Sequence, residues 1–166
     1  MRYYKIKSYA KINISLGILD KPKNKLHKIE SLISFINLHD EIFIKKINDK
    51  NHKIIFYGKF SKGIFKNNTI SNLLKLLEKK LSGQKFFIKI NKKIPSKSGM
   101  GGGSMNASSL LNFLIKNQKL NLSSKEIYKI SSKIGSDVII GLQKKTSILY
   151  GNGHIKYLNN KINLYT

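Results

Sequence analysis

A glycine-rich stretch at residues 94–108 is the part of this sequence best suited to chemistry, with four glycines among the five residues 99–103. The preceding residues 85–94 alternate and are rich in β-forming side chains, which predicts a strand. From Ala107 to Ile115 the apolar residues recur with the spacing of an amphipathic helix. A strand, a glycine loop and a helix N-terminus direct backbone N–H groups and the positive end of a helix dipole toward one place, where an anion such as phosphate binds. Glycines let the backbone approach that anion closely and adopt positive φ.

This stretch matches neither of the two common phosphate-binding patterns. No Gly-Lys-Ser/Thr follows at the Walker A spacing, and Ser104 occupies the place of the last glycine in G-x-G-x-x-G. Judged by glycine content alone, a flexible surface turn remains an alternative. The position of the stretch between a strand and a helix favours the phosphate site.

The acidic residues are few enough to weigh one by one, because the chain has only eight. Asp137 differs from the others because it follows Gly135 in an apolar context, where burial would require a compensating partner. Two roles stay open for it, the N-cap of a short segment at Val138 and a catalytic base. For the other seven, a turn, a cap or a solubilising surface charge is a sufficient role: Asp20, Glu30, Asp40, Glu41, Asp49, Glu78 and Glu126.

A lysine on a strand near the N-terminus is the third candidate for chemistry, after the glycine-rich stretch and Asp137. The predicted strand 10–19 carries alternating apolar residues from Ile12 to Ile18 on one face, so Lys11 lies on the other face. A lysine in such a place is usually solvated. Together with the glycine stretch and Asp137, however, it completes what a phosphoryl transferase needs, namely a phosphate site, a base and a cation.

Other chemistries are disfavoured by what the sequence lacks. The four histidines include no pair at helical i, i+4 spacing, so a histidine metal site is not indicated. No Gly-x-Ser-x-Gly nucleophile elbow is present. The absence of cysteine excludes disulfides, thiol nucleophiles and cysteine-bound zinc.

The net charge of +24, from 32 Lys and Arg against 8 Asp and Glu, raises the question of a nucleic-acid partner. Arg2 is the only arginine, and lysine, isoleucine and asparagine are abundant throughout, as expected from drift toward A- and T-rich codons. Base recognition favours the forked arginine side chain, so nucleic-acid binding is disfavoured as the main role. The positive field is expected to attract an anionic small-molecule substrate.

The periodicities predict one α+β domain without repeats or linkers. No apolar run approaches the roughly 20 residues of a membrane span, and residues 1–16 do not resemble a signal peptide, so we expect no membrane partner and a cytoplasmic address. Predicted strands are 3–7, 10–19, 26–37, 41–47, 53–57, 85–94, 146–150, 154–158 and a last one at 163–166, with 48–52 as a hairpin loop. Predicted helices run from a cap at Asn68 or Thr69 to about Leu81, over 105–117, and over 125–133 after a cap at Ser123 or Ser124, with a break at 134–137.

The glycine stretch, from Ile94-Pro95 through Gly99–Ala107, resembles the phosphate-binding motif of the GHMP small-molecule kinases. Three further segments, Ala10–Ile18, His27–Leu32 and Ile134–Val138, narrow the resemblance to the branch of that family that acts on 4-diphosphocytidyl-2-C-methyl-D-erythritol in the non-mevalonate isoprenoid pathway. The implied activity is ATP-dependent phosphorylation of the substrate's 2-hydroxyl. The implied fold is the N-terminal, ATP-binding GHMP lobe, related to the second domain of ribosomal protein S5. Another GHMP kinase, such as a homoserine or mevalonate kinase, and a non-catalytic RNA- or ribosome-associated S5-like domain are the alternatives.

The resemblance also implies residue roles. Lys11 and Asp137 match the family's catalytic residues, Asn13 and His27 match positions of the substrate site, and Ser104 is a candidate contact for Mg²⁺. It assigns ATP binding to Pro95, Ser96, Lys97, Ser98, Gly99, Met100, Gly101, Gly102, Gly103, Ser104 and Met105.

Three departures from the family pattern stand out. Leu26 replaces a tyrosine usual before the histidine, and Met105 replaces the second serine of the usual Gly-Gly-Gly-Ser-Ser run. Family members also continue past residue 166 into a second lobe. Either these residues are a piece of a longer protein or the protein is shortened; an end within a predicted strand favours the piece, and we expect weak or no turnover from residues 1–166 alone.

Overall fold

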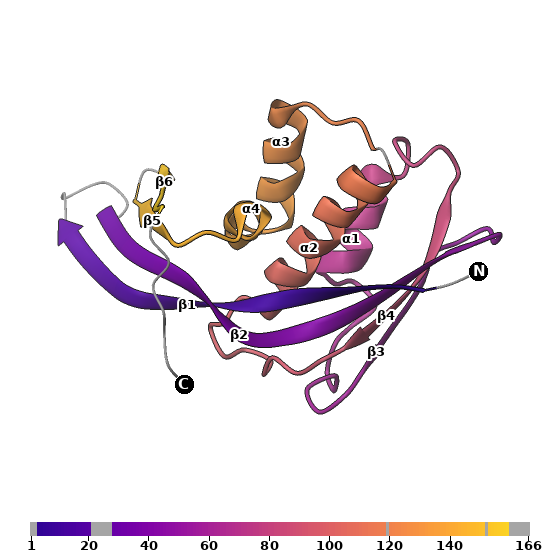
Figure 1. The fold of residues 1–166 in the computed structure, drawn as a ribbon, viewed down its shortest axis with the longest axis horizontal. Helices are drawn as coiled ribbons and strands as arrows, with labels where there is room; N and C mark the ends of the chain where they lie inside the picture. The colour runs from indigo at the N-terminus through magenta and orange to yellow at the C-terminus, as the bar shows by residue number, and fades with distance from the viewer. Residues whose placement is uncertain (1–2, 21–27, 119, 152, 160–166) are drawn as a thin grey trace.

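The structure is a computed structural model that describes residues 3–20, 28–118, 120–151 and 153–159. Within those residues, six strands form one sheet and four helices lie on one face of it (Figure 1). The predicted α+β class is confirmed. The predicted strand at 163–166, together with His27 and Leu26, falls outside the described residues.

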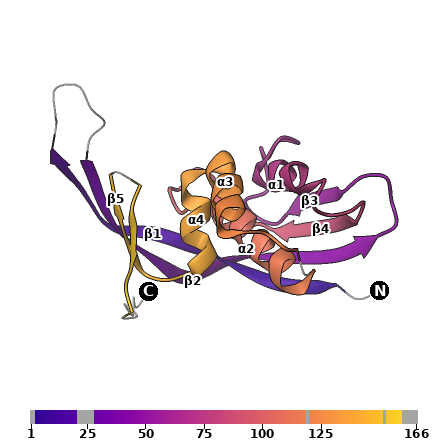
Figure 2. The same cartoon turned by 90° about the horizontal axis from the view of Figure 1, so that it is seen from above.

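The sheet is built around two long strands. β1 (Tyr4–Asp20) and β2 (Lys28–Ile47) pair antiparallel along their length and extend beyond the helices (Figures 1 and 2). The prediction of four shorter strands here was wrong. The β1–β2 register shifts between Tyr9 and Lys11, and such an irregularity bends a strand and re-aims its side chains without ending it.

The centre of the sheet differs from the predicted hairpin. β4 (Lys85–Asn91) lies between β2 and β3 (Lys53–Tyr57), antiparallel to β2 and parallel to β3. Thus β2 and β3 do not form a hairpin around residues 48–52. The parallel β3–β4 pair is joined through a helix, as a parallel connection requires, and β4 takes the inner place with its alternate apolar side chains fully buried.

The last two strands agree with the prediction. β5 (Ser147–Tyr150) and β6 (Ile155–Tyr157) form an antiparallel hairpin, and β5 pairs with residues 30–33 of β2. This hairpin lies beside the part of the β1–β2 ribbon that extends past the helices (Figure 1).

The helices are α1 (Thr69–Leu77), α2 (Gly102–Asn117), α3 (Ser124–Ile134) and α4 (Ser136–Gln143). Asn68 caps α1, since its side chain accepts hydrogen bonds from the N–H groups of Ile70 and Ser71, both at 3.0 Å. The predicted end at Leu81 is one turn too late, because the chain leaves the helix after Leu77, although Leu81 remains buried. Ser123 caps α3 in a capping box with Glu126, as predicted.

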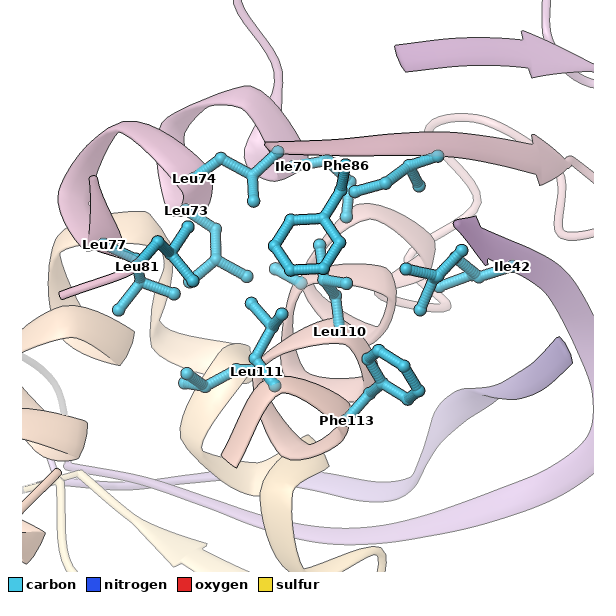
Figure 3. Close-up of a cluster of buried hydrophobic side chains, with 14 of the residues drawn as sticks. Ile42, Ile70, Leu73, Leu74, Leu77, Leu81, Phe86, Leu110, Leu111 and Phe113 are labelled. Atoms are coloured by element: carbon cyan, nitrogen blue, oxygen red, sulfur yellow. The ribbon is translucent and has the colours of Figure 1, made fainter. Parts of the chain in front are cut away.

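The hydrophobic core lies between the helices and the central strands β2 and β4, with α2 in the middle of the layer (Figures 1 and 3). Residues that α1, β2, β4 and α2 contribute to it include Ile42, Ile70, Leu73, Leu74, Leu77, Phe86, Leu110 and Leu111 (Figure 3). None of the helices in the described part of the chain is long and apolar enough to cross a membrane. This packing fixes α2, whose N-terminus carries the glycine stretch.

Candidate functional site

The glycine stretch leads directly into a helix. Helix α2 begins at Gly102, three residues before the predicted start, with Gly101 as the N-cap in the left-handed conformation (φ 66°). A Cβ at Gly102 would lie 3.2 Å from Ile94 Cγ2 and 3.2 Å from Lys92 Nζ, so the lack of a side chain lets the helix start close to the segment that follows β4. Since the first N–H groups of a helix have no partner within it, they remain available to an anion.

A pocket of about 450 Å³ lies over this helix N-terminus. Residues 95–104 line it, and these are the predicted ATP-binding residues other than Met105. The remaining lining residues are Phe56, Gly63, Ile64, Phe65, Asn68, Thr69, Lys92 and Asn106. Met105 is placed elsewhere: its side chain is buried and faces α4, where a Cβ at Gly141 would lie 3.0 Å from Met105 Cε.

Lys11 and Asp137 form an ion pair beside the glycine loop. Lys11 Nζ lies 3.3 Å from Asp137 Oδ2 and donates a hydrogen bond to Asn13 Oδ1 at 3.2 Å. The Lys11 side chain is only 8% exposed, so the usual solvated role does not apply, whereas the Asp137 side chain is 26% exposed and within reach of a ligand. Asp137 is not an N-cap, because Gly135 holds that position and Asp137 belongs to the first turn of α4, where the helix dipole favours a carboxylate.

The glycine loop touches this pair directly. Gly101 lies so close to it that an added Cβ would be 3.0 Å from Lys11 Cγ and 3.5 Å from Asp137 Oδ2. The Lys11 N–H also donates to the Met100 carbonyl at 3.1 Å. Ser104 Oγ would lie 3.3 Å from a Cβ at Gly135, so this hydroxyl faces the start of α4. The fold therefore brings together the predicted cation, base and phosphate loop from β1, α4 and α2.

Three buried polar residues behind the loop were missed or misjudged. Asp40 is fully buried rather than a turn former or surface charge, and it pairs with Lys92 and with Asn106. The sequence contained a signal for this, because alternate residues of a strand point to the same face, and Asp40 alternates with Ile42 and Ile44, which face the core.

The pocket also has apolar lining residues, Ile64 and Phe65, that the sequence analysis did not predict, because residues 58–68 show no periodicity.

The oxygen donors near the loop suit a nucleotide-bound magnesium ion better than a permanent metal site. The described residues include no group of three or more His, Cys, Asp or Glu side chains that could hold a metal ion. Mg²⁺ that arrives with a nucleotide needs only one or two protein oxygen ligands besides phosphates and water. The Ser104 hydroxyl, in the first turn of α2, can supply such a ligand.

Comparison with known proteins gives the family. Residues 68–151, from the start of α1 to the end of β5, match the family model for the N-terminal domain of GHMP kinases. The chain belongs to the GHMP kinase family. The matched segment contains the whole glycine loop and Asp137, whereas Lys11 lies N-terminal to it.

Relatives within the family are similar over nearly the whole chain. The 4-diphosphocytidyl-2-C-methyl-D-erythritol kinase of Pelagibacter ubique (strain HTCC1062) is 56% identical over 167 residues, which cover 99% of this chain and 59% of the relative. The enzyme of the same name from Petrotoga mobilis is 37% identical over 90% of this chain and 57% of its own length. The chain thus spans less than two thirds of these relatives.

Solved structures agree with the family fold. A crystal structure of 4-(cytidine 5'-diphospho)-2C-methyl-D-erythritol kinase superposes with a TM-score of 0.77 at 22% identity, covering 93% of this chain and 55% of that one. A homoserine kinase from Cytophaga hutchinsonii gives a TM-score of 0.66 at 16% identity, over 95% of this chain and 52% of its own. These likenesses establish the GHMP fold.

Proposed function

We propose that the protein catalyses ATP-dependent phosphorylation of the 2-hydroxyl of 4-diphosphocytidyl-2-C-methyl-D-erythritol, a step in the synthesis of isoprenoid precursors by the non-mevalonate route. The similarity to kinases of that name over almost the whole chain supports the choice of substrate. One structural observation carries the reaction type: the Lys11–Asp137 pair lies directly against Gly101 of the loop at the N-terminus of α2.

ATP would occupy the pocket over α2. The N–H groups at the start of α2 and the positive end of its dipole would hold the phosphates. Phe56, Ile64 and Phe65 line the pocket together with the loop and offer apolar surface for the purine, with Phe65 81% exposed and free to pack against it. The Ser104 hydroxyl would be a ligand of Mg²⁺, which would neutralise phosphate charge when it is bound with the nucleotide.

The transfer would use Asp137 and Lys11 in separate roles. The Asp137 carboxylate takes the proton of the attacking hydroxyl. The hydroxyl oxygen forms a bond to the γ-phosphorus while the bond to the bridging oxygen of ADP breaks. Lys11, held by Asp137 and Asn13, places a positive charge where the alkoxide develops and where charge collects on the transferred phosphoryl group.

The substrate would approach along β1. Asn13 is exposed and already oriented by its hydrogen bond with Lys11, which makes it suitable for contact with the methylerythritol part. His27 remains the proposed contact of the cytosine. We further propose that residues 1–166 form the ATP-binding lobe of a cytoplasmic enzyme, and that the part of the relatives beyond the matched length completes the substrate cleft.

The test is a coupled ADP-release assay on the full-length gene product with the cytidyl substrate. Removing either reacting group, in Lys11→Met or Asp137→Asn, should lower kcat by about 10²- to 10⁴-fold, while the surface controls Lys5→Met and Asp49→Asn keep full rate. Unchanged turnover in both site variants would falsify the assigned roles. Homoserine and mevalonate belong in the same assay, since faster turnover of either would reassign the substrate.

A further inference from the structure

The carboxylate of Asp40 accepts four hydrogen bonds next to the phosphate loop, although it reaches neither the pocket nor the Lys11–Asp137 pair. Asp40 is fully buried. Oδ1 accepts hydrogen bonds from two successive backbone N–H groups, those of Lys93 at 2.7 Å and Ile94 at 2.9 Å. Oδ2 accepts from Lys92 Nζ and from Asn106 Nδ2, the latter at 3.0 Å.

These four donors lie on both sides of the glycine loop. Lys93 and Ile94 are the last two residues before Pro95, where the loop begins. Asn106 lies in the second turn of α2, after the loop has become a helix. Asp40 itself belongs to β2, so one carboxylate connects the central sheet to the segment that enters the loop and to the helix that leaves it.

The same contacts explain where β4 ends. The predicted strand 85–94 stops at Asn91, because the N–H groups of Lys93 and Ile94 bond to a side chain instead of a neighbouring strand. The chain is thereby turned from the sheet toward the pocket.

Lys92 adds charge to this arrangement. Its ammonium lies 3.2 Å from the place of a Cβ at Gly102, under the first turn of α2, and it lines the pocket. A buried ammonium requires a compensating charge, and Asp40 provides it. Asn106 also lines the pocket and is buried, and among the described residues its Oδ1 has no hydrogen-bond partner.

We propose that Asp40 is the positioning residue of the phosphate loop: its buried carboxylate fixes both ends of the loop and sets the ammonium of Lys92 beneath it. Asp40 acts through the loop and touches no substrate. The inference rests on the proposed function, because it presumes that the pocket binds a nucleotide.

The experiment measures the affinity of MgATP for the full-length gene product by isothermal titration calorimetry, together with the thermal unfolding midpoint of each variant. Asp40→Asn keeps the size of the side chain but loses an acceptor and leaves Lys92 without a counter-charge. We expect its Kd for MgATP to rise about 10- to 100-fold at temperatures where it is fully folded, since small displacements of positioned groups have effects of that size.

A matched control is the neighbouring acid. Glu41→Gln removes a carboxylate that points to the opposite face of the sheet and pairs with Lys5 and Lys93 side chains, without contacting the loop backbone. Its Kd should equal that of the wild type. Hydrogen exchange supplies a local readout: the amides of Lys93 and Ile94 should exchange faster in Asp40→Asn and not in Glu41→Gln.

The outcomes separate the two proposals. If the wild type binds no nucleotide, the proposed function fails. If the wild type binds and folded Asp40→Asn binds equally well, Asp40 has only a structural role and the inference is overturned. If Asp40→Asn does not fold, Asn106→Ala decides, because it releases only the helix side of the loop and should still raise the Kd several-fold; an unchanged Kd there overturns the inference as well.

Discussion

A methyl group at Gly101 should impair catalysis more than it impairs folding. Gly101 has φ 66°, and an alanine Cβ there would lie 3.0 Å from Lys11 Cγ and 3.3 Å from Lys11 Cε. The ordinary separation of carbon atoms is about 3.5–4.0 Å, so the Lys11 side chain must move by roughly 0.5 Å. Gly101→Ala therefore displaces the ammonium from Asp137 while leaving both charges present.

Two effects of this substitution can be separated by magnitude. The left-handed backbone conformation should cost about 1 kcal/mol of stability with alanine, which lowers the unfolding midpoint by roughly 2–4 °C in a protein of this size. Displacement of Lys11 should lower kcat about 10- to 100-fold, or about 1.4 to 2.8 kcal/mol of activation free energy. The KM for ATP should change less, because the start of α2 keeps its N–H groups.

Gly83→Ala is the matched control. Gly83 also has positive φ (78°), but nothing lies within 4 Å of its Cβ position, and it follows α1 away from the pocket. It should show the same loss of stability with an unchanged kcat. Steady-state kinetics and thermal unfolding of both variants of the full-length gene product give the comparison. Equal kcat values for Gly101→Ala and wild type, or an equal loss in both variants, would refute the reasoning.

Three further predictions concern stability. Gly141→Ala places a methyl group against the Ser108 side chain between α4 and α2 and should cost about 1–3 kcal/mol through overpacking, measured by urea unfolding. Ser123→Ala removes the capping box of α3 and should cost about 1 kcal/mol without a change in kcat. Burial lowers the pKa of His52 below its usual value of about 6.5, more than the nearby Glu78 raises it. The unfolded state therefore takes up this proton first, and the free energy of unfolding should fall as the pH drops from about 7 to 5, less so in His52→Gln.

Each of these predictions has an outcome that contradicts it. Gly141→Ala with wild-type stability would mean that the α2–α4 contact is loose enough to accept a methyl group. A Ser123→Ala variant with reduced kcat would mean that loosening the start of α3 also displaces α4, which begins at the glycine where α3 ends. A pH dependence equal in the wild type and His52→Gln would show that His52 titrates alike in the folded and unfolded states.

Local patterns were sufficient for much of the architecture. The β5–β6 hairpin, the capped helix α3 and the apolar face of α1 follow from spacing and capping residues, because the interactions that form them lie within a few residues of one another. Strand boundaries were less predictable. The β1–β2 irregularity near Lys11 disrupts the alternation on which such predictions depend, and the pairing of β4 between β2 and β3 depends on competition among strands far apart in the sequence.

For the site, the sequence was sufficient to name candidate residues, whereas their distances from one another and their burial depend on the tertiary structure. Glycine spacing before a helix predicted an anion site, since glycine lets the backbone approach a ligand closely. Lys11 and Asp137 were candidates by type and context, but only the packing of β1 and α4 against α2 sets them 3.3 Å apart and withdraws the lysine from water. The only local sign that Asp40 is buried was its alternation along the strand with the core residues Ile42 and Ile44. The proposed role of Asp40 depends on four donors, three in residues 92–94 after the end of β4 and one on α2. The chain brings these donors together only on folding, and a buried carboxylate needs such partners.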